Sequence, residues 1–236
     1  MLTNAAMALG EAPARLGTPA ATRSDRAAME RVIRDYLLKN PEVIREAMEA
    51  LRQQDEVAAA RRARETLAAE RDGMLNDASA QFLGNKKGDV TIVEFFDYRC
   101  GYCKQIAAPL EKLIRSDPNV RVMLKELPVL GPQSEFAARV ALAARGTGRY
   151  AEFHRALLAA QDLTEAGVRE VAAKVGLGER VFEDAASAEV AETLRQTSML
   201  AERLGINGTP GLIIGDQVLP GAVSYEALQK LVAAER

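Results

Sequence analysis

Two cysteines, Cys100 and Cys103, are the only thiols in a chain of 236 residues, and two residues separate them. A structural zinc site needs four Cys or His ligands, and the chain has one histidine to add to the pair. A structural disulfide across so short a loop removes little entropy from the unfolded chain, so it contributes little stability. We therefore favour redox catalysis, in which the two thiols exchange with a disulfide.

The position of Cys100 supports this interpretation. It lies between an apolar run that predicts a buried strand, "VTIVEFF", and a predicted helix, "CKQIAAPLEKLIRS". Unpaired N–H groups and the helix dipole stabilise an anion at such a junction, and the thiolate is the attacking species in disulfide exchange. We expect Cys100 to attack a disulfide and Cys103, about one turn into the helix, to resolve the mixed disulfide.

The elements that carry this pair read as an α/β fold. Residues 81–83, 90–98 and 119–129 predict strands, and the helix between the last two is long enough to make those strands parallel. Residues 133 to about 204 predict helices throughout. Two short strands then flank a Gly215-Asp216 turn, and Ser224 caps a closing helix.

The N-terminal part predicts a different architecture. We expect a flexible tail over residues 1–22, a helical oligomerisation region over 23–56, a helical linker over 57–76 and a catalytic domain over 77–236. Asn40 and Pro41 divide the second region into two helices, each with an apolar stripe, that are too small to form a core alone. The linker is polar on all sides and predicts a solvent-bridging spacer. We therefore expect the stripes to meet copies of themselves.

Composition narrows the possible partners. The net charge is −2, the sequence pI is about 5.7 and tryptophan is absent, so nucleic acid is not an expected partner. No run is apolar and long enough to span a membrane. The first residues lack the basic and apolar regions of a signal peptide, so we expect that any such peptide is absent from or was removed from this chain.

The segment "VEFFDYRCGYCK" resembles the active-site strand and helix of the thioredoxin superfamily, in its DsbA-like branch. The order of elements and "GINGTPGLIIG" are similar to that branch over about residues 81–232. "YLLKNPEVIREAMEAL" and "LGPQSEFAARVALAA" resemble more closely the periplasmic subset that includes suppressor of copper sensitivity protein C. The resemblance implies a thioredoxin fold with a helical insertion, preceded by an N-terminal helical stalk that joins subunits, as in trimeric members of the subset.

The resemblance also implies roles for individual residues. Cys100 and Cys103 match the redox pair, with Gly101 and Tyr102 as the dipeptide that tunes its potential; the Pro-His dipeptide of the strong oxidant DsbA is not present. Thr209 and Pro210 match a cis-proline loop that pairs with an extended substrate. Glu94 matches a buried acid that takes the proton of Cys103.

Three further residues are read from the sequence itself. Asp97 and Arg99 flank the site, and we expect His154, on a predicted helix, to be a packed or surface residue.

Three functions follow as hypotheses. The first is a periplasmic disulfide isomerase or reductase that acts on proteins containing cysteines, works as a homotrimer and is kept reduced by a membrane thiol reductase. It needs no cofactor beyond a redox-active disulfide between Cys100 and Cys103. The second is a DsbA-like dithiol oxidase. The third is a copper-relay protein that binds Cu(I) through the two thiolates.

Overall fold

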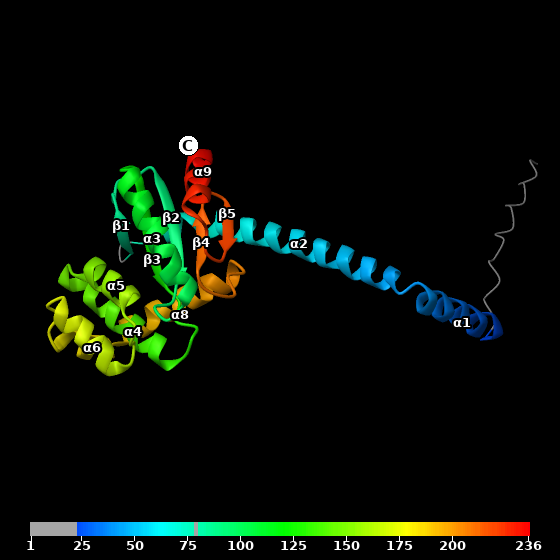
Figure 1. The fold of residues 1–236 in the computed structure, drawn as a ribbon, viewed down its shortest axis with the longest axis horizontal. Coiled ribbons are helices and arrows are strands. Elements are labelled where there is room, and N and C mark those ends of the chain that lie inside the picture. Colours follow the sequence, from blue (N-terminus) through cyan, green and yellow to red (C-terminus); the bar gives the residue numbers. More distant parts are fainter. Residues whose placement is uncertain (1–22, 78–79) are drawn as a thin grey trace, which may run out of the picture. The chain divides into compact units, whose positions relative to one another are not determined.

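The computed structural model describes residues 23–77 and 80–236, and the chain divides into two compact units, residues 1–55 and 56–236. The tail expected at residues 1–22 lies outside the described residues. The second unit contains every strand that the structure describes and both cysteines (Figure 1).

Two helices account for the described part of the first unit. Helix α1 spans Arg23–Lys39, and α2 spans Glu42–Leu75 and continues into the second unit. The predicted break at Asn40 and Pro41 is confirmed. The side-chain amide of Asn40 donates to the carbonyl oxygen of Tyr36, one turn earlier in α1, at 2.8 Å. Asn40 therefore terminates α1 with its side chain.

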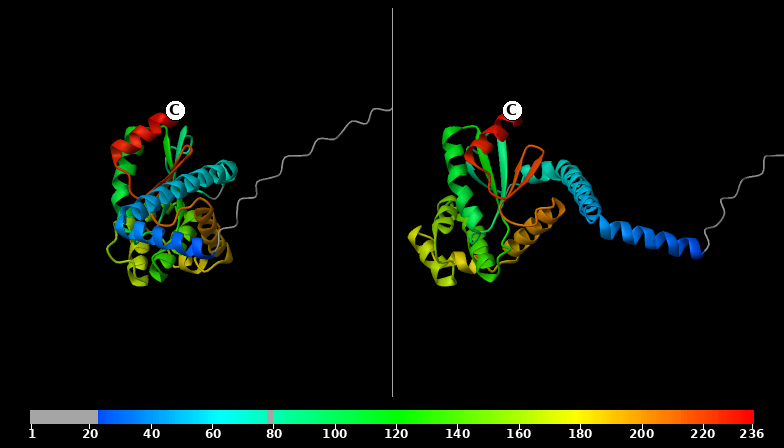
Figure 2. Two further views of the ribbon diagram at one scale, coloured as in Figure 1. Left: turned by 90° about the vertical axis from the view of Figure 1, so that its right-hand side faces the viewer. Right: turned by 45° about the vertical axis from the view of Figure 1, so that its right-hand side comes forward.

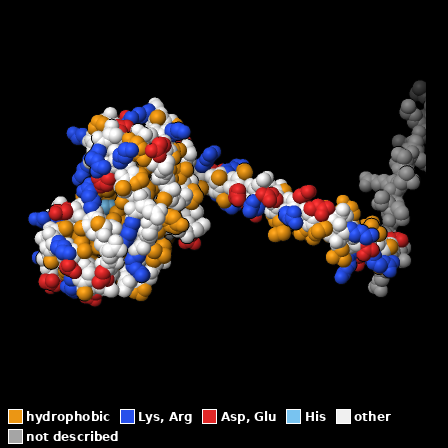
Figure 3. Space-filling view, viewed as in Figure 1, with side chains coloured by type: hydrophobic (Ala, Val, Ile, Leu, Met, Phe, Trp, Pro, Cys, Tyr) orange, Lys and Arg blue, Asp and Glu red, His pale blue; other side chains and the backbone are white. Residues whose placement is uncertain are grey.

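The apolar residues of α1 and of the first half of α2 remain exposed within the single chain. Figure 3 shows hydrophobic side chains on this part of the molecule. So many large apolar side chains exposed on two helices are typical of an interaction surface. We call this set the N-terminal apolar face, which consists of Met29, Val32, Ile33, Tyr36, Leu38, Ile44, Met48, Leu51 and Val57.

The C-terminal part of α2 differs from the expected spacer. Leu67 is 1% exposed and Met74 is 5% exposed, and both pack with Val93, Phe95 and other residues of the sheet. These apolar positions are too few to form a visible helical pattern in the sequence. The packing of this part of α2 against the sheet is therefore not apparent from the sequence alone. The linker is helical as expected, but it bridges solvent only in part.

The second unit is built on one mixed five-stranded sheet of order β1-β3-β2-β4-β5. Strands β2 and β3 are parallel, as predicted, and every other neighbouring pair is antiparallel. The strands are β1 (Gln81–Gly84), β2 (Val90–Phe96), β3 (Val120–Glu126), β4 (Gly211–Ile214) and β5 (Gln217–Pro220).

Helices cover both faces of this sheet. Helices α3 (Gly101–Ser116) and α9 (Tyr225–Glu235) pack on one face, as Figure 2 shows. The end of α2 and the end of α8 (Ala188–Arg203) cover the other face. Side chains alternate along β2, so Ile92 and Phe96 belong to the α3 face while Val93 and Phe95 belong to the α2 face.

The predicted helical segment lies between β3 and β4, at one end of the sheet (Figure 1). Its start at α4 and its end at α8 agree with the expected range of about 133–204. The elements before α8 are α4 (Pro132–Ala143), η1 (Ala144–Thr147), α5 (Tyr150–Ala159), α6 (Glu165–Lys174) and α7 (Arg180–Asp184).

The C-terminal hairpin and helix form as predicted. Gly215 adopts a φ of 57°, which lets β4 turn tightly into β5. The hydroxyl of Ser224 accepts a hydrogen bond from the backbone N–H of Ala227 at 3.2 Å and caps α9. Among the helices in the described ranges, none combines the length and apolar character needed to cross a bilayer.

Candidate active site

Helix α3 begins directly after Cys100, which occupies its N-cap position with extended backbone angles. The backbone N–H of Cys100 donates to the carbonyl oxygen of Asp97 at 3.0 Å, so the turn between β2 and α3 is closed. The Cys100 side chain caps no backbone group of α3, and its Sγ donates to the carbonyl oxygen of Thr209 at 3.2 Å. The sulfur therefore faces the loop before β4.

The two thiols are both free and differ in their surroundings. Cys100 retains 7% exposure and Cys103 has none. Burial, more than any other cause, raises the pKa of the Cys103 thiol well above its ordinary value, and the nearby Cys100 and Glu94 act in the same direction. Cys103 is thus a protonated, shielded thiol beside one that reaches the surface.

The loop opposite Cys100 has the expected backbone. The peptide bond between Thr209 and Pro210 is cis, and Pro210 is buried immediately before β4. Thr209 is partly exposed, and its carbonyl oxygen points to Cys100. The fold thus brings Thr209 and Pro210 next to the cysteine pair, although more than one hundred residues of chain separate them.

Glu94 lies on β2 and is 3% exposed. Because side chains alternate along a strand, Glu94 shares the α3 face with Ile92 and Phe96. Burial raises the pKa of Glu94 from 4.5 to about 8. The side chain lines a hollow of about 310 Å³ that also includes Lys104 and His154, so this buried acid has an opening on the α3 face.

The dipeptide between the cysteines is exposed. Gly101 has no neighbouring atom that a side chain would meet, and Tyr102 is 64% exposed. Both residues therefore lie on the surface that a substrate would approach.

Asp97 is a buried residue that holds two loops together. Its carboxylate accepts from the backbone N–H of Arg99 at 2.8 Å and of Leu130 at 3.0 Å, while the Arg99 guanidinium donates to the Leu130 carbonyl at 2.9 Å. These bonds fix Val129 and Leu130, which are 51% and 46% exposed, beside the active-site turn. Sequence reasoning missed this apolar loop, although "LPVL" after β3 is a visible signal.

A buried hydrogen-bond network lies behind the site, and the sequence did not reveal it. Tyr150 donates to Glu126, Tyr98 interacts with Tyr150, and the Tyr98 hydroxyl lies 3.2 Å from His154 Nδ1. Burial raises the pKa of Glu126 and lowers the pKa of His154 to about 3, so the histidine is neutral. His154 is therefore a packed residue, and Tyr98 is tied to the helical segment.

The described residues offer a metal ion only a limited set of ligands. No group of three or more His, Cys, Asp or Glu side chains in residues 23–77 and 80–236 is arranged to hold a metal. Cys100 and Cys103 are the two soft ligands at the site.

This geometry places the molecule among the thioredoxin-type thiol-disulfide oxidoreductases, whose exchange chemistry uses one accessible and one shielded thiol. The chain belongs to the DsbA-like thioredoxin domain family, whose family model matches residues 91–233. A second family model, the copper resistance protein ScsC N-terminal domain, matches residues 25–58.

Solved structures support the assignment. A thioredoxin-like oxidoreductase from Silicibacter pomeroyi DSS-3 is 44% identical, with a TM-score of 0.67, and the match covers 70% of this chain and 96% of that one. A linker-deletion mutant of Proteus mirabilis ScsC, which carries one further substitution, is 28% identical, with a TM-score of 0.70, covering 93% and 98% of the two chains. The second match includes the N-terminal helices.

The curated relatives are much longer proteins. Na(+)/H(+) antiporter NhaA 3 of Salinispora tropica is 31% identical over 153 residues, which is 63% of this chain and 24% of the antiporter. The chain therefore spans about a quarter of the length of that relative, and the same holds for NhaA 1 of Salinispora arenicola.

Proposed function

We propose that this protein exchanges disulfides with client proteins through Cys100 and Cys103. The observation that carries the proposal is the contact of Cys100 Sγ with the Thr209 carbonyl, next to a thiol with no exposure. A client that forms a mixed disulfide with Cys100 meets the Thr209 backbone, with which an extended peptide can pair.

The reaction needs only the two thiols and a proton acceptor. The Cys100 thiolate attacks a client disulfide, a bond forms between Cys100 and one client sulfur, and the other client sulfur leaves as a thiolate. Cys103 then loses its proton to the ionised form of Glu94 and attacks Cys100 Sγ. This step forms the Cys100–Cys103 disulfide and releases the client thiolate, so the client gains two electrons and the protein loses two.

We favour isomerisation, in which a second client thiolate attacks the mixed disulfide, a new client disulfide forms and Cys100 leaves as a thiolate without net oxidation of the protein. The N-terminal apolar face supports this choice. Association through that face gives a homotrimer in which several active sites share one client at high effective concentration. Residues 25–58, which match the ScsC N-terminal domain, contain all of the face. We place this activity in the periplasm, with a membrane thiol reductase keeping the cysteines reduced.

Ribonuclease refolding tests the direction of the reaction. An isomerase restores activity to scrambled ribonuclease, and Cys100→Ser abolishes the effect. Activity on reduced ribonuclease alone shows a dithiol oxidase. Failure with both substrates and with a small-molecule disulfide overturns the proposal.

Copper binding is a second candidate, because residues 25–58 match a domain named for copper resistance. Two thiolates are suitable ligands for Cu(I). Titration of the reduced protein with Cu(I) should then show one site that Cys100→Ser removes. Equal binding by wild type and variant eliminates this candidate.

A further inference from the structure

We propose that α2 forms one wall of the client-binding site, in a hollow that accepts a bulky apolar side chain next to the client's cysteine. The inference rests on the proposed function, because the hollow begins at Thr209. The hollow would select clients by apolar contact and takes no part in the exchange reaction of the thiols. The inference assigns a role in client selection to Ala59, Ala60 and Ala63.

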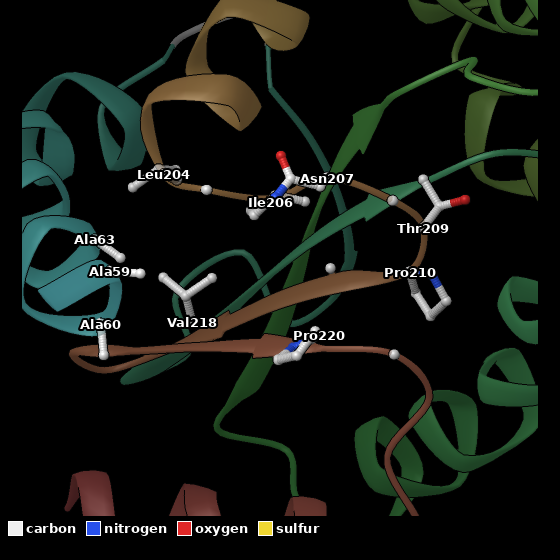
Figure 4. A pocket seen from close by; sticks show the side chains of 14 residues that line it. Ala59, Ala60, Ala63, Leu204, Ile206, Asn207, Thr209, Pro210, Val218 and Pro220 are labelled. Atoms are coloured by element: carbon white, nitrogen blue, oxygen red, sulfur yellow. The ribbon is translucent and has the colours of Figure 1, made fainter. Parts of the chain in front are cut away.

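Figure 4 shows the hollow between α2 and the loop that ends at Pro210. The three alanines lie on one side, Thr209 and Pro210 lie on the opposite side, and Val218 of β5 lies between them. The volume of the hollow is about 400 Å³, which is within the range of pockets that bind a ligand group.

The lining is apolar and small. None of the described residues that line the hollow is charged, and the polar side chains among them are those of Asn207 and Thr209. Alanine and glycine occupy much of the wall, so the space is left for a side chain that comes from outside. A leucine-sized or aromatic group fits this chemistry, and a charged group would be desolvated without a partner.

The hollow lies next to the reacting sulfur through Thr209. Thr209 lines it, and the carbonyl oxygen of Thr209 lies 3.2 Å from Cys100 Sγ. A client cysteine bonded to Cys100 therefore begins at one end of the hollow. Because an extended chain advances about 3.3 Å per residue, the residues next to that cysteine are the ones that reach the alanine wall.

The wall is held in place by contacts further along α2. Leu67, one turn beyond Ala63, is buried against the sheet, and Arg71 pairs with Asp216 at 2.9 Å. The alanines lie outside both matched segments, residues 25–58 and 91–233. The wall is thus a feature of this chain that neither family model describes.

The test uses the full reduced protein and a matched pair of peptide disulfides, one with leucine beside the cysteine and one with serine. The wild type should reduce the leucine peptide about tenfold faster, the factor expected for burying much of one such side chain. Ala60→Glu should remove that preference. Ala68→Glu is the control, because Ala68 is exposed on the same helix and does not line the hollow.

A small neutral disulfide, 2-hydroxyethyl disulfide, separates this inference from the proposed function. It should react equally with wild type and both variants. No reaction by the wild type overturns the proposed function. Normal reaction without a leucine preference, or with a preference that survives Ala60→Glu, overturns the inference alone. If Ala60→Glu also loses the small-disulfide reaction, Ala59→Glu decides by the same criteria.

Discussion

The difference between the two sulfurs is the main residue-scale feature of this molecule. Cys100 reaches the surface at the start of α3, and Cys103 is fully buried with a raised pKa. The proposed attacking and resolving roles rest on this difference in exposure, since the more exposed sulfur is the one that a client disulfide can meet first. Nothing in the spacing of the pair alone would distinguish them.

Alkylation measures this asymmetry. At pH 8 we expect iodoacetamide to modify Cys100 faster than Cys103 by about a hundredfold or more, because Cys103 has no exposure and its raised pKa lowers its thiolate fraction about tenfold per unit. Single Cys→Ser variants give the two rates separately by mass spectrometry. Equal rates would contradict the assigned roles.

Glu94 predicts a pH dependence of stability. Its pKa is raised to about 8 in the folded protein from 4.5, so the folded state holds a proton that the unfolded state releases. The protein therefore loses stability as the pH rises from 4.5 to 8, by on the order of 3 kcal/mol at pH 7. Glu94→Gln should remove the contribution of Glu94 to this slope in urea denaturation across that range, and the contributions of Glu126 and His154 should remain.

The same substitution tests the proton transfer. Resolution of the mixed disulfide should accelerate as the pH rises through about 8, because Glu94 becomes a base. In Glu94→Gln the step near pH 8 should be absent, which leaves only the rise from ionisation of Cys103 itself, and the mixed disulfide should persist about a hundredfold longer near that pH. A variant with an unchanged pH profile would exclude Glu94 as the proton acceptor.

At the scale of elements, α2 is both a connection and part of the second unit. Leu67 and Met74 place its last turns in the core on one face of the sheet. The ion pairs of this region, such as Arg71 with Asp216, are partly exposed and contribute little by comparison. Apolar burial therefore fixes the helix.

Leu67→Ala tests this docking. We expect a loss of about 2 to 5 kcal/mol in the free energy of unfolding, because the side chain is 1% exposed and leaves a cavity. Met199→Ala on α8, where the side chain is 42% exposed, should change stability by no more than about 0.5 kcal/mol. Similar small losses for both would show that α2 is not part of the core.

At the scale of the whole molecule, we expect the N-terminal apolar face to set the oligomeric state. Light scattering of the Ile33→Asp, Met48→Asp double variant should give a monomer, because both residues are exposed members of that face. Gln53→Asp with Gln54→Asp adds the same charge at polar positions and should keep the oligomer. The monomer should retain dithiol reactivity and lose much of its isomerase activity.

The docking of α2 also limits how the oligomerisation region can be removed. A chain without residues 1–75 would lose Leu67 and Met74 from the core. A cut before Glu56, at the boundary between the two units, leaves these contacts in place.

Short stretches of sequence were sufficient to predict much of this molecule. The Cys-x-x-Cys pair, the strand before it, the parallel β2–β3 pair and the Gly215 turn are each encoded within a short segment, through apolar runs, helix propensity and turn residues. The same holds for the exposed stripes of α1 and α2, whose periodicity needs no tertiary context.

Only the tertiary structure decided which distant groups meet. The carbonyl oxygen of Thr209 lies 3.2 Å from Cys100 Sγ, although 109 positions separate the two residues. His154 contacts Tyr98, and Leu67 packs into the core from a helix whose sequence is mostly polar. Such contacts depend on how layers pack, and packing is set by the shape and burial of many side chains together. A sequence pattern records which residues are apolar or reactive, but the distances between them arise only when the chain folds.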